Sequence, residues 1–284
     1  MSLNKKLVAI VGQTGSGKTD LAIRLAQKFE GEIVCADSRT IYKEMNVGTA
    51  KPTQEQTKEI VHHCLDLVSP DQMYSVAQFK RDADQAIHQI ISNDKLPFLV
   101  GGSGLYIDAV LYDFELNKAS VNKVDKRLSL SNLQALAKEL NLDVTEQTMK
   151  NKQHLIRFIE RNGQDSRAIK TDALIIGISV DKPTLEKRIT ARIGKMFSDG
   201  LVAEAQSLLG KYPKSSRSLN APGYRVVGQY VEGKVSLEQA KSNFIKQDLV
   251  LAKKQKTWFK RNADIYWVDG YNEAEQLIGK YLLQ

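Results

Sequence analysis

Residues 12–19 are Gly12-Gln13-Thr14-Gly15-Ser16-Gly17-Lys18-Thr19, and they directly follow the apolar run Leu7-Val8-Ala9-Ile10-Val11. An apolar helical pattern comes next, at Leu21, Ala22, Leu25 and Phe29. Strand, glycine-rich loop and helix in this order are the setting that the phosphate-binding loop G-x-x-x-x-G-K-[ST], the P-loop, requires. The sequence therefore predicts a phosphate site between the first strand and the first helix.

The residue types in this loop suit a phosphate group. Glycines let backbone N–H groups turn toward phosphate oxygens, and the helix N-terminus adds partial positive charge. Lys18 is expected to reach the outer phosphate, and the Thr19 hydroxyl to ligate Mg²⁺. The candidate phosphate-binding residues are Gly12, Thr14, Gly15, Ser16, Gly17, Lys18 and Thr19. The motif does not distinguish a nucleoside triphosphate from the diphosphate of a leaving group.

Apolar runs bounded by turn residues predict further strands. Together with the first, the predicted strands are residues 7–12, 32–36, 97–101 and 173–180. Helical patterns lie between and after them, at residues 17–29, 53–61, 75–93, 183–210, 223–231 and 236–260. Strands separated by helices predict an α/β fold, a P-loop parallel sheet with helices on both faces.

Residues 114–172 differ from the rest of the chain. They contain no strand-like run, and they carry short helical patterns such as Leu133-Leu136-Ala137-Leu140. We interpret them as a small helical insertion domain. The remaining residues, 1–113 and 173–284, are then the P-loop core with its C-terminal helices.

Composition limits the class of protein. The chain has 284 residues and a net charge of +8, which permits a polyanionic partner. Its two cysteines and four histidines show no metal-site spacing, and the lack of a disulfide framework leads us to expect a reducing cytoplasm. No apolar run is long enough for a signal peptide or a membrane span, so no membrane association is expected.

Asp37 ends the second predicted strand, after Ile33-Val34-Cys35-Ala36. The carboxyl edge of an α/β sheet is where such folds bind ligands, so Asp37 is expected beside the phosphate loop. Three roles suit this carboxylate: a magnesium ligand, an acceptor of a substrate proton, or a cap of a helix or turn. Ser38, Arg39 and Thr40 follow it and make this loop rich in hydrogen-bond donors.

Three glycines follow the third predicted strand, in Gly101-Gly102-Ser103-Gly104. A nucleotide hydrolase typically carries an acid at this place. Glycines instead indicate that the backbone is closely approached by another group, which disfavours an ordinary ATPase. A tight turn before a packed helix is the alternative interpretation.

The C-terminal helical segment is basic. Residues 241–262 hold seven Lys and Arg residues and one acid, Asp248. Phe244, Leu249, Leu251 and Ala252 alternate with this charge, so one face is expected to pack and the other to be basic. The basic face is suited either to RNA phosphates or to solvent alone. Trp258 and Phe259 are expected to pack in the core, with stacking on bases as the alternative.

In order along nearly the whole chain, these motifs resemble those of the tRNA dimethylallyltransferases, also called tRNA isopentenyltransferases. The phosphate loop by itself is unspecific, whereas the ordered series is highly specific. The resemblance includes Asp37-Ser38-Arg39-Thr40-Ile41-Tyr42, Gly48-Thr49-Ala50-Lys51-Pro52, His62-His63 with Asp66, Tyr74 to Phe79, Gly101-Gly102-Ser103-Gly104-Leu105-Tyr106, Gly200 to Leu208, Gly223-Tyr224, and Ala252-Lys253-Lys254-Gln255 with Thr257-Trp258-Phe259.

The resemblance implies a reaction. A dimethylallyl group moves from dimethylallyl diphosphate to the exocyclic amine (N6) of the adenosine adjacent to the anticodon in tRNA, and diphosphate is released. It implies that Lys18, Thr19 and Lys254 hold the diphosphate with Mg²⁺, and that Asp37 takes the proton of the amine. We expect a cytoplasmic monomer that grips the anticodon arm of the tRNA with its insertion domain and basic tail.

The resemblance also implies the residues that contact tRNA. The adenosine must leave its stack to reach the site, and the two loops after the second and third strands would line its channel. The implied tRNA-binding residues are Asp37, Ser38, Arg39, Thr40, Gly102, Ser103, Gln153, Arg157, Lys253 and Gln255.

The sequence departs from the family pattern at several positions. Thr40 replaces Gln, Ser103 replaces Thr, Lys254 replaces Arg, Asp248-Leu249 replaces Thr-Arg, and His154 replaces Arg. Lysine cannot reproduce the forked donor of arginine near a diphosphate. Two other classes stay open: a P-loop small-molecule kinase or prenyltransferase of free adenine nucleotide, which would not need residues 114–172, and a non-catalytic RNA-binding protein.

Overall fold

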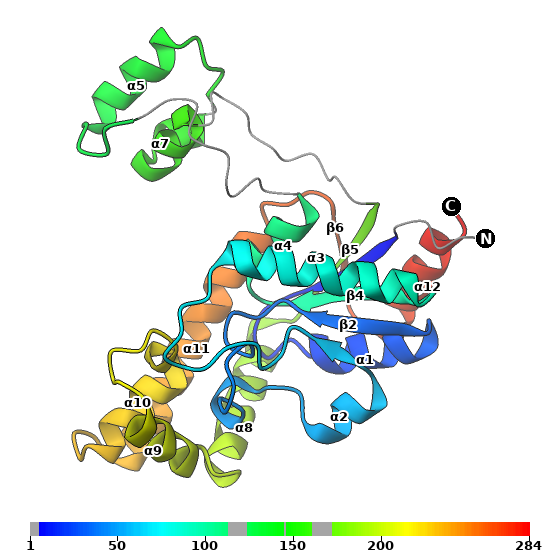
Figure 1. Cartoon of the computed structure of the whole chain (residues 1–284), viewed down its shortest axis with the longest axis vertical. Helices are drawn as coiled ribbons and strands as arrows, with labels where there is room; N and C mark the ends of the chain where they lie inside the picture. The colour runs from blue at the N-terminus through cyan, green and yellow to red at the C-terminus, as the bar shows by residue number, and fades with distance from the viewer. Residues whose placement is uncertain (1–5, 113–123, 145, 161–171) are drawn as a thin grey trace. The chain divides into compact units, whose positions relative to one another are not determined.

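The computed structural model describes residues 6–112, 124–144, 146–160 and 172–284. They belong to two compact units. Met1–Leu111 with Thr171–Gln284 form the larger one, here called the core unit, and Tyr112–Lys170 form the smaller one (Figure 1).

The core unit is built on a parallel sheet with the strand order β3-β2-β4-β1-β5-β6. The strands are β1 (Leu7–Val11), β2 (Gly31–Cys35), β3 (His62–His63), β4 (Leu96–Gly101), β5 (Ala173–Ile178) and β6 (Ile265–Val268). The central strands are almost continuously apolar and buried, as a sheet covered on both faces requires. Val11 lies opposite both Gly101 and Gly177, so the carboxyl ends of three strands meet at one edge.

Helices cover both faces of this sheet. They include α1 (Lys18–Lys28) and α3 (Val76–Ser92) on opposite faces, together with α2 (Gln54–Glu59), α4 (Gly104–Leu111) and α12 (Tyr271–Leu282) (Figure 1). The apolar sides of α1 and α12 pack into the same core cluster as Ile10 and Phe98. The predicted α/β class, with a parallel sheet between helices, is confirmed.

A group of C-terminal helices extends the carboxyl edge of the sheet. It consists of α8 (Lys182–Ser198), α9 (Leu201–Lys211), α10 (Pro222–Val231) and α11 (Leu237–Phe259), with the short 3-10 helices η1 (Val47–Thr49) and η2 (Ser218–Asn220) (Figure 1). Ile41 and Met45, from the loop after β2, pack into the same apolar cluster as Tyr224 and Phe244. The helix group is therefore fixed directly to the loop that carries Asp37.

Several details differ from the sequence-based expectations. The helix predicted at residues 183–210 is two helices, because Gly200 has a φ of 99° in the left-handed region that favours glycine. His62 and His63, for which no strand was predicted, pair with β2 as a two-residue strand. The strand β6 was not predicted, because it is only four residues long and two of them, Tyr266 and Trp267, are exposed.

The smaller unit is helical in its described part. It contains α5 (Leu130–Glu139), α6 (Glu146–Met149) and α7 (Lys152–Glu160). Its apolar side chains form a separate core, with the buried residues Val124, Leu133, Ala137, Leu155, Ile156 and Ile159. A second core of its own is what makes this segment a separate packing unit.

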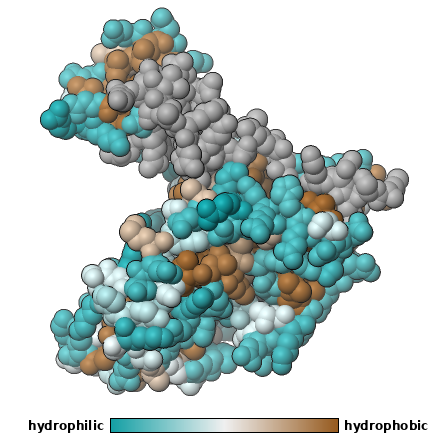
Figure 2. Space-filling model, in the orientation of Figure 1, coloured by the Kyte–Doolittle hydropathy of each residue, from teal (hydrophilic) through white to brown (hydrophobic). Residues whose placement is uncertain are grey.

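The visible face of the described residues is mostly hydrophilic, with hydrophobic patches between the hydrophilic residues (Figure 2). In the part of the chain that the structure describes, no helix combines the length and the apolar character needed to cross a membrane.

Packing at the carboxyl edge of the sheet is very tight at Gly101, so one added methyl group there should lower the stability of the protein. A Cβ at Gly101 would lie 2.0 Å from the Ala36 carbonyl oxygen, a backbone atom that cannot rotate away. We expect Gly101→Ala to lower the free energy of unfolding by about 1–3 kcal/mol, the usual cost of overpacking. Denaturant unfolding of the purified variant measures this.

Gly279→Ala, inside α12, is the matched control, because a Cβ there meets no atom within 4 Å. It is expected to leave stability unchanged or to raise it by up to about 1 kcal/mol. Equal stabilities of the two alanine variants would contradict the predicted clash between Gly101 and Ala36.

Candidate active site

The glycine loop connects β1 to α1 and leaves the N-terminus of α1 open. Gly15 and Gly17 have φ values of 77° and 89°, in the region that favours glycine. Gly17 is the N-cap of α1 and has no side chain to bond the first N–H groups of the helix. Those groups and the helix dipole therefore remain for an anion.

Ser16 adds an unpaired donor to this loop. The residue is buried, and its Oγ has no hydrogen-bond partner among the described residues. A Cβ at Gly12 would lie 2.8 Å from this Oγ, so glycine at position 12 keeps the space beside the hydroxyl open. A buried hydroxyl without a partner is rare, and it fits an oxygen atom of a bound ligand.

Two glutamines attach the glycine loop to α11. Gln13 Nε2 donates to the Ala252 carbonyl oxygen at 3.0 Å. The Gln255 amide lies between two loops, since its Oε1 accepts from Thr14 N at 2.7 Å and its Nε2 donates to the Gly102 carbonyl oxygen at 3.0 Å. The predicted tRNA-binding residue Gln255 thus joins the glycine loop to the loop after β4.

The three glycines after β4 are each approached closely, as the sequence predicted, and the approaching groups belong to the chain itself. A Cβ at Gly101 would meet Ala36, a Cβ at Gly102 would lie 2.4 Å from Gln255 Nε2, and a Cβ at Gly104 would lie 2.3 Å from the Trp258 ring. Glycine is needed here so that α11 and the end of β2 reach the loop.

Lys18 is a partly buried cation at the start of α1, directly after the glycine loop. Burial lowers its pKa from 10.5 to about 8, although the Asp37 carboxylate opposes this shift, and the Arg192 guanidinium lowers the pKa further. Its Nζ lies 3.4 Å from the Gln13 carbonyl oxygen. Asp37 and Arg192 therefore both lie within electrostatic reach of Lys18.

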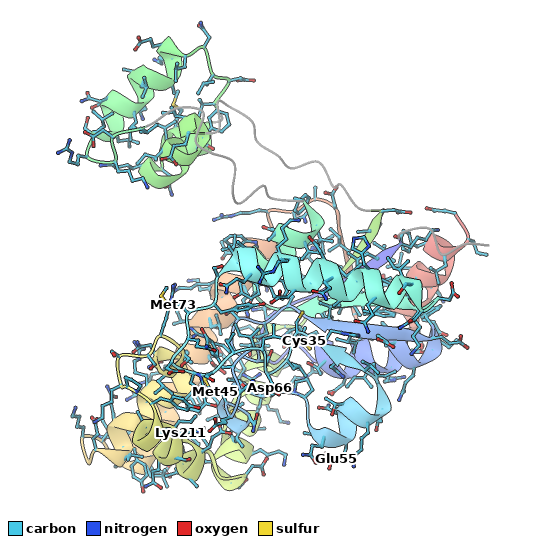
Figure 3. All side chains as sticks on the ribbon, viewed as in Figure 1. Cys35, Met45, Glu55, Asp66, Met73 and Lys211 are labelled. Atoms are coloured by element: carbon cyan, nitrogen blue, oxygen red, sulfur yellow. The ribbon has the colours of Figure 1, made fainter. Side chains whose placement is uncertain are left out.

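Asp37 follows β2 at the carboxyl edge of the sheet, two residues after Cys35, which Figure 3 labels. Its Oδ1 accepts from Arg39 N at 2.8 Å, so one oxygen is used in a local turn. Ser103 Oγ accepts from Ser38 N at 3.0 Å, which ties this turn to the loop after β4. Thr40 is buried beyond them, and its Oγ1 has no partner within the described part of the chain.

Two arginines of α8, neither of which was predicted as a site residue, lie near the glycine loop and α11. Arg188 Nη1 donates to the Ser16 carbonyl oxygen at 3.1 Å, and Arg192 Nη2 donates to Asp248 Oδ2 at 2.5 Å. Residues four apart lie on the same face of a helix, so α8 presents both guanidinium groups together. Their spacing, in a helix directly after a central strand, was the signal that could have found them.

Tyr106 lies within electrostatic reach of Asp37 and of two arginines. The Tyr106 ring stacks on Phe79 with centroids 4.2 Å apart. Burial raises the pKa of Tyr106 to about 12, and the guanidinium groups of Arg39 and Arg217 oppose the rise. Phe79 and Tyr106 are both buried, so this ring stack belongs to the core, and the two guanidinium groups supply positive charge near it.

Glu204 holds the next loop in place. Its carboxylate accepts from the backbone N–H groups of Asn46, Val47 and Gly48, each at 2.9 Å, and from Tyr224 Oη at 2.7 Å. The same loop is anchored at its end by Lys51, which pairs with Asp66, labelled in Figure 3.

The basic residues of α11 are more exposed. Lys253 and Lys254 both face solvent, and Lys254 makes no ion pair with a described residue. Phe259 is buried as predicted, whereas Trp258 is 39% exposed and donates from Nε1 to Asp108 Oδ2 at 2.9 Å. Leu251, expected on the packed face, is also exposed.

The predicted tRNA contacts of the insertion lie on α7, which includes positions 153 and 157. The side chains of Gln153 and Arg157 are outside the described residues. Their contribution to RNA binding stays a prediction.

Metal-binding groups are sparse. Within the described ranges there is no group of three or more His, Cys, Asp or Glu side chains that could hold a metal ion. His63 Nε2 lies 2.7 Å from Glu32 Oε2, and His62 Nδ1 lies 2.7 Å from the Ile60 carbonyl oxygen. Both histidines lie in the edge strand β3, where each makes a local contact.

Comparison with known proteins connects this site to one family. The model of the IPP transferase family matches residues 40–262. A tRNA dimethylallyltransferase of Macrococcus caseolyticus is 37% identical, over 93% of this chain and 90% of that protein. One of Staphylococcus aureus is 33% identical, over 98% and 97%.

Solved structures agree. The tRNA isopentenylpyrophosphate transferase of Bacillus halodurans is 30% identical, with a TM-score of 0.78 over 99% of this chain and 97% of that one. A eukaryotic dimethylallyltransferase acting on tRNA, 24% identical, shares the fold with a TM-score of 0.75. Because the family model spans most of the chain and the relatives match it almost from end to end, this chain belongs to the IPP transferase family.

Proposed function

We propose that this protein transfers a dimethylallyl group from dimethylallyl diphosphate to N6 of the adenosine adjacent to the anticodon in tRNA. The observation that carries the proposal is the common location of an open anion loop and a strand-end carboxylate, Asp37, which is within electrostatic reach of Lys18. Membership of the family supports the class of reaction. We further propose that it acts as a monomer in the cytoplasm.

The donor end of the site is built for a diphosphate leaving group. The open N-terminus of α1, the unpaired Ser16 hydroxyl and the cations Lys18 and Arg192 surround the same loop. Negative charge grows on the diphosphate as the allylic carbon–oxygen bond breaks, and fixed positive groups stabilise that charge. Lys254 is a further candidate, whose exposed ammonium would act at the outer rim.

Mg²⁺ fits this site as an ion shared with the substrate. It is commonly bound by one or two protein ligands together with substrate phosphates, so a full set of protein ligands is not required. The Thr19 hydroxyl, in the first turn of α1, is the residue that would hold the ion. When bound, Mg²⁺ would neutralise part of the charge on the leaving diphosphate.

The acceptor end of the site is formed by Asp37 and the loops beside it. One Asp37 oxygen is engaged by Arg39 N, which leaves the other to accept the proton of the adenine amine as its nitrogen attacks. Ser38, Thr40 and Ser103 lie on the same loops and offer polar contacts to the base. Lys253 and the basic face of α11 are suited to the phosphates of the anticodon arm.

Removing the proposed general base, Asp37, should lower turnover without weakening the binding of the donor. We expect Asp37→Asn to lower kcat for transfer by about 10²–10⁴-fold, the usual contribution of a general base. The affinity for inorganic pyrophosphate with Mg²⁺ should not fall, because the substitution removes a negative charge near the anion site. Single-turnover kinetics and calorimetry measure the two quantities.

Asp71→Asn, which changes an exposed carboxylate in the core unit, is the control and should leave both quantities unchanged. If Asp37→Asn lost less than about tenfold in kcat, the assignment of Asp37 as the base would be wrong.

The pKa of Lys18 predicts how donor binding depends on pH. In the free protein Lys18 is charged below pH 8 and loses its proton as the pH rises through about 8. At pH 7, Lys18→Met should therefore weaken pyrophosphate binding by about tenfold or more, the value of one charge-assisted hydrogen bond. Above pH 8 the difference between the two proteins should shrink, because the wild-type lysine also becomes neutral.

Comparing the two proteins at each pH cancels the titration of pyrophosphate itself. A ratio of dissociation constants that stays constant from pH 7 to pH 9.5 would contradict the role of Lys18.

The kinase alternative is tested with the same protein. A kinase would release ADP from ATP in the presence of an acceptor, and we expect no release of ADP.

A further inference from the structure

Asp248 is an acid in the middle of the basic helix α11, and it is 6% exposed. Its carboxylate pairs with Arg192 of α8, with Oδ2 and Nη2 2.5 Å apart. The two helices are in contact along this region. The pair is therefore a fixed part of the site and not a surface ion pair.

The charge of Asp248 is unfavourable for the proposed substrate. A carboxylate near the glycine loop repels a diphosphate, and burial raises its pKa above the usual range while the Asp37 carboxylate adds to the rise. Arg192 is the group that opposes both effects. The contribution of Asp248 to the site must therefore come through the arginine.

The geometry of Arg192 shows what that contribution is. One terminal nitrogen of its guanidinium is held by Asp248, whereas Nε is buried and has no hydrogen-bond partner among the described residues. The same guanidinium is close enough to Lys18 to lower the pKa of its ammonium. A planar guanidinium held at one end presents its remaining N–H groups in a fixed direction, which suits phosphate oxygens.

We propose that Asp248 is a positioning residue, whose carboxylate holds Arg192 so that its unpaired N–H groups face the diphosphate of the donor. The nature of the anion rests on the proposed function. Asp248 itself touches neither substrate, and it acts through Arg192 alone.

The direction in which Asp248→Asn changes the affinity for an anion distinguishes a positioning role from a purely electrostatic one. Asp248→Asn removes a negative charge, so a purely electrostatic role predicts tighter binding of an anion. Positioning predicts weaker binding, because the guanidinium loses its charged partner. We expect the dissociation constant of inorganic pyrophosphate with Mg²⁺, measured by calorimetry on the full chain, to rise about tenfold.

Steady-state kinetics give a second readout that a general loss of structure would not produce. For Asp248→Asn the KM for dimethylallyl diphosphate should rise, whereas the KM for tRNA should stay unchanged. Arg192→Lys keeps the charge but loses the fork, so it should weaken pyrophosphate binding similarly. Adding Asp248→Asn to Arg192→Lys should then cause little further loss.

Glu32→Gln is the matched control. Glu32 is also a buried carboxylate in an ion pair, with Lys95 and His63, but it lies in β2 five positions before Asp37, toward the amino end of the strand. It should leave pyrophosphate binding unchanged even where it lowers the unfolding temperature. If Asp248→Asn does not fold, Arg192→Lys tests the same contact from the other side.

The proposal is overturned if Asp248→Asn binds pyrophosphate as tightly as the wild type or more tightly. It is also overturned if Arg192→Lys binds normally, or if the wild type does not bind pyrophosphate, a result that removes the proposed function as well. A third outcome separates the two proposals. If the wild type binds pyrophosphate but does not transfer the dimethylallyl group, and Asp248→Asn weakens pyrophosphate binding, the proposed function is wrong and the role of Asp248 is supported.

Discussion

The site depends on the close contact between the loop after β4 and the groups around it. Gly101 lies against the Ala36 carbonyl oxygen, and Gln255 of α11 joins Thr14 to Gly102. These contacts place the anion loop, the Asp37 turn and the basic helix at one edge of the sheet. Since the nearest atoms all belong to the backbone of Ala36, no side chain larger than hydrogen fits at Gly101 without displacing that backbone.

The site has positive charge at its donor end, by the glycine loop, and a carboxylate at its acceptor end. Cations lie at the glycine loop, where Lys18, with a pKa of about 8, remains positive below about pH 8. The Asp37 carboxylate lies within electrostatic reach of Lys18. Leaving-group departure needs the cations and nitrogen attack needs the carboxylate, so a single site serves both halves of the proposed transfer. Arg192 connects the two helices α8 and α11 through Asp248. Leu249 stands where the family pattern has an arginine. In this proposal, Arg192 of α8 is the counterpart of that arginine.

The sequence predicted the features that arise from local patterns. The α/β class, the glycine loop and the strand end at Asp37 follow from apolar runs and glycines alone. The strand β6 and the break at Gly200 were missed, because a four-residue edge strand is a weak pattern and one glycine inside a long helical pattern is ambiguous. Arg188 and Arg192 were missed because their role depends on how α8 packs. The close approach at Gly101, Gly102 and Gly104 was predicted, but its partners, Ala36 and α11, became known only from tertiary structure.

The central claim is that these two ends act on one donor and one adenosine. The most direct measurement incubates the protein with Mg²⁺, dimethylallyl diphosphate and an unmodified tRNA with adenosine next to its anticodon, and then determines the masses of the nuclease fragments. The account predicts a gain of C5H8 on that adenosine and release of diphosphate. Unchanged fragments from a protein that binds both substrates would contradict it.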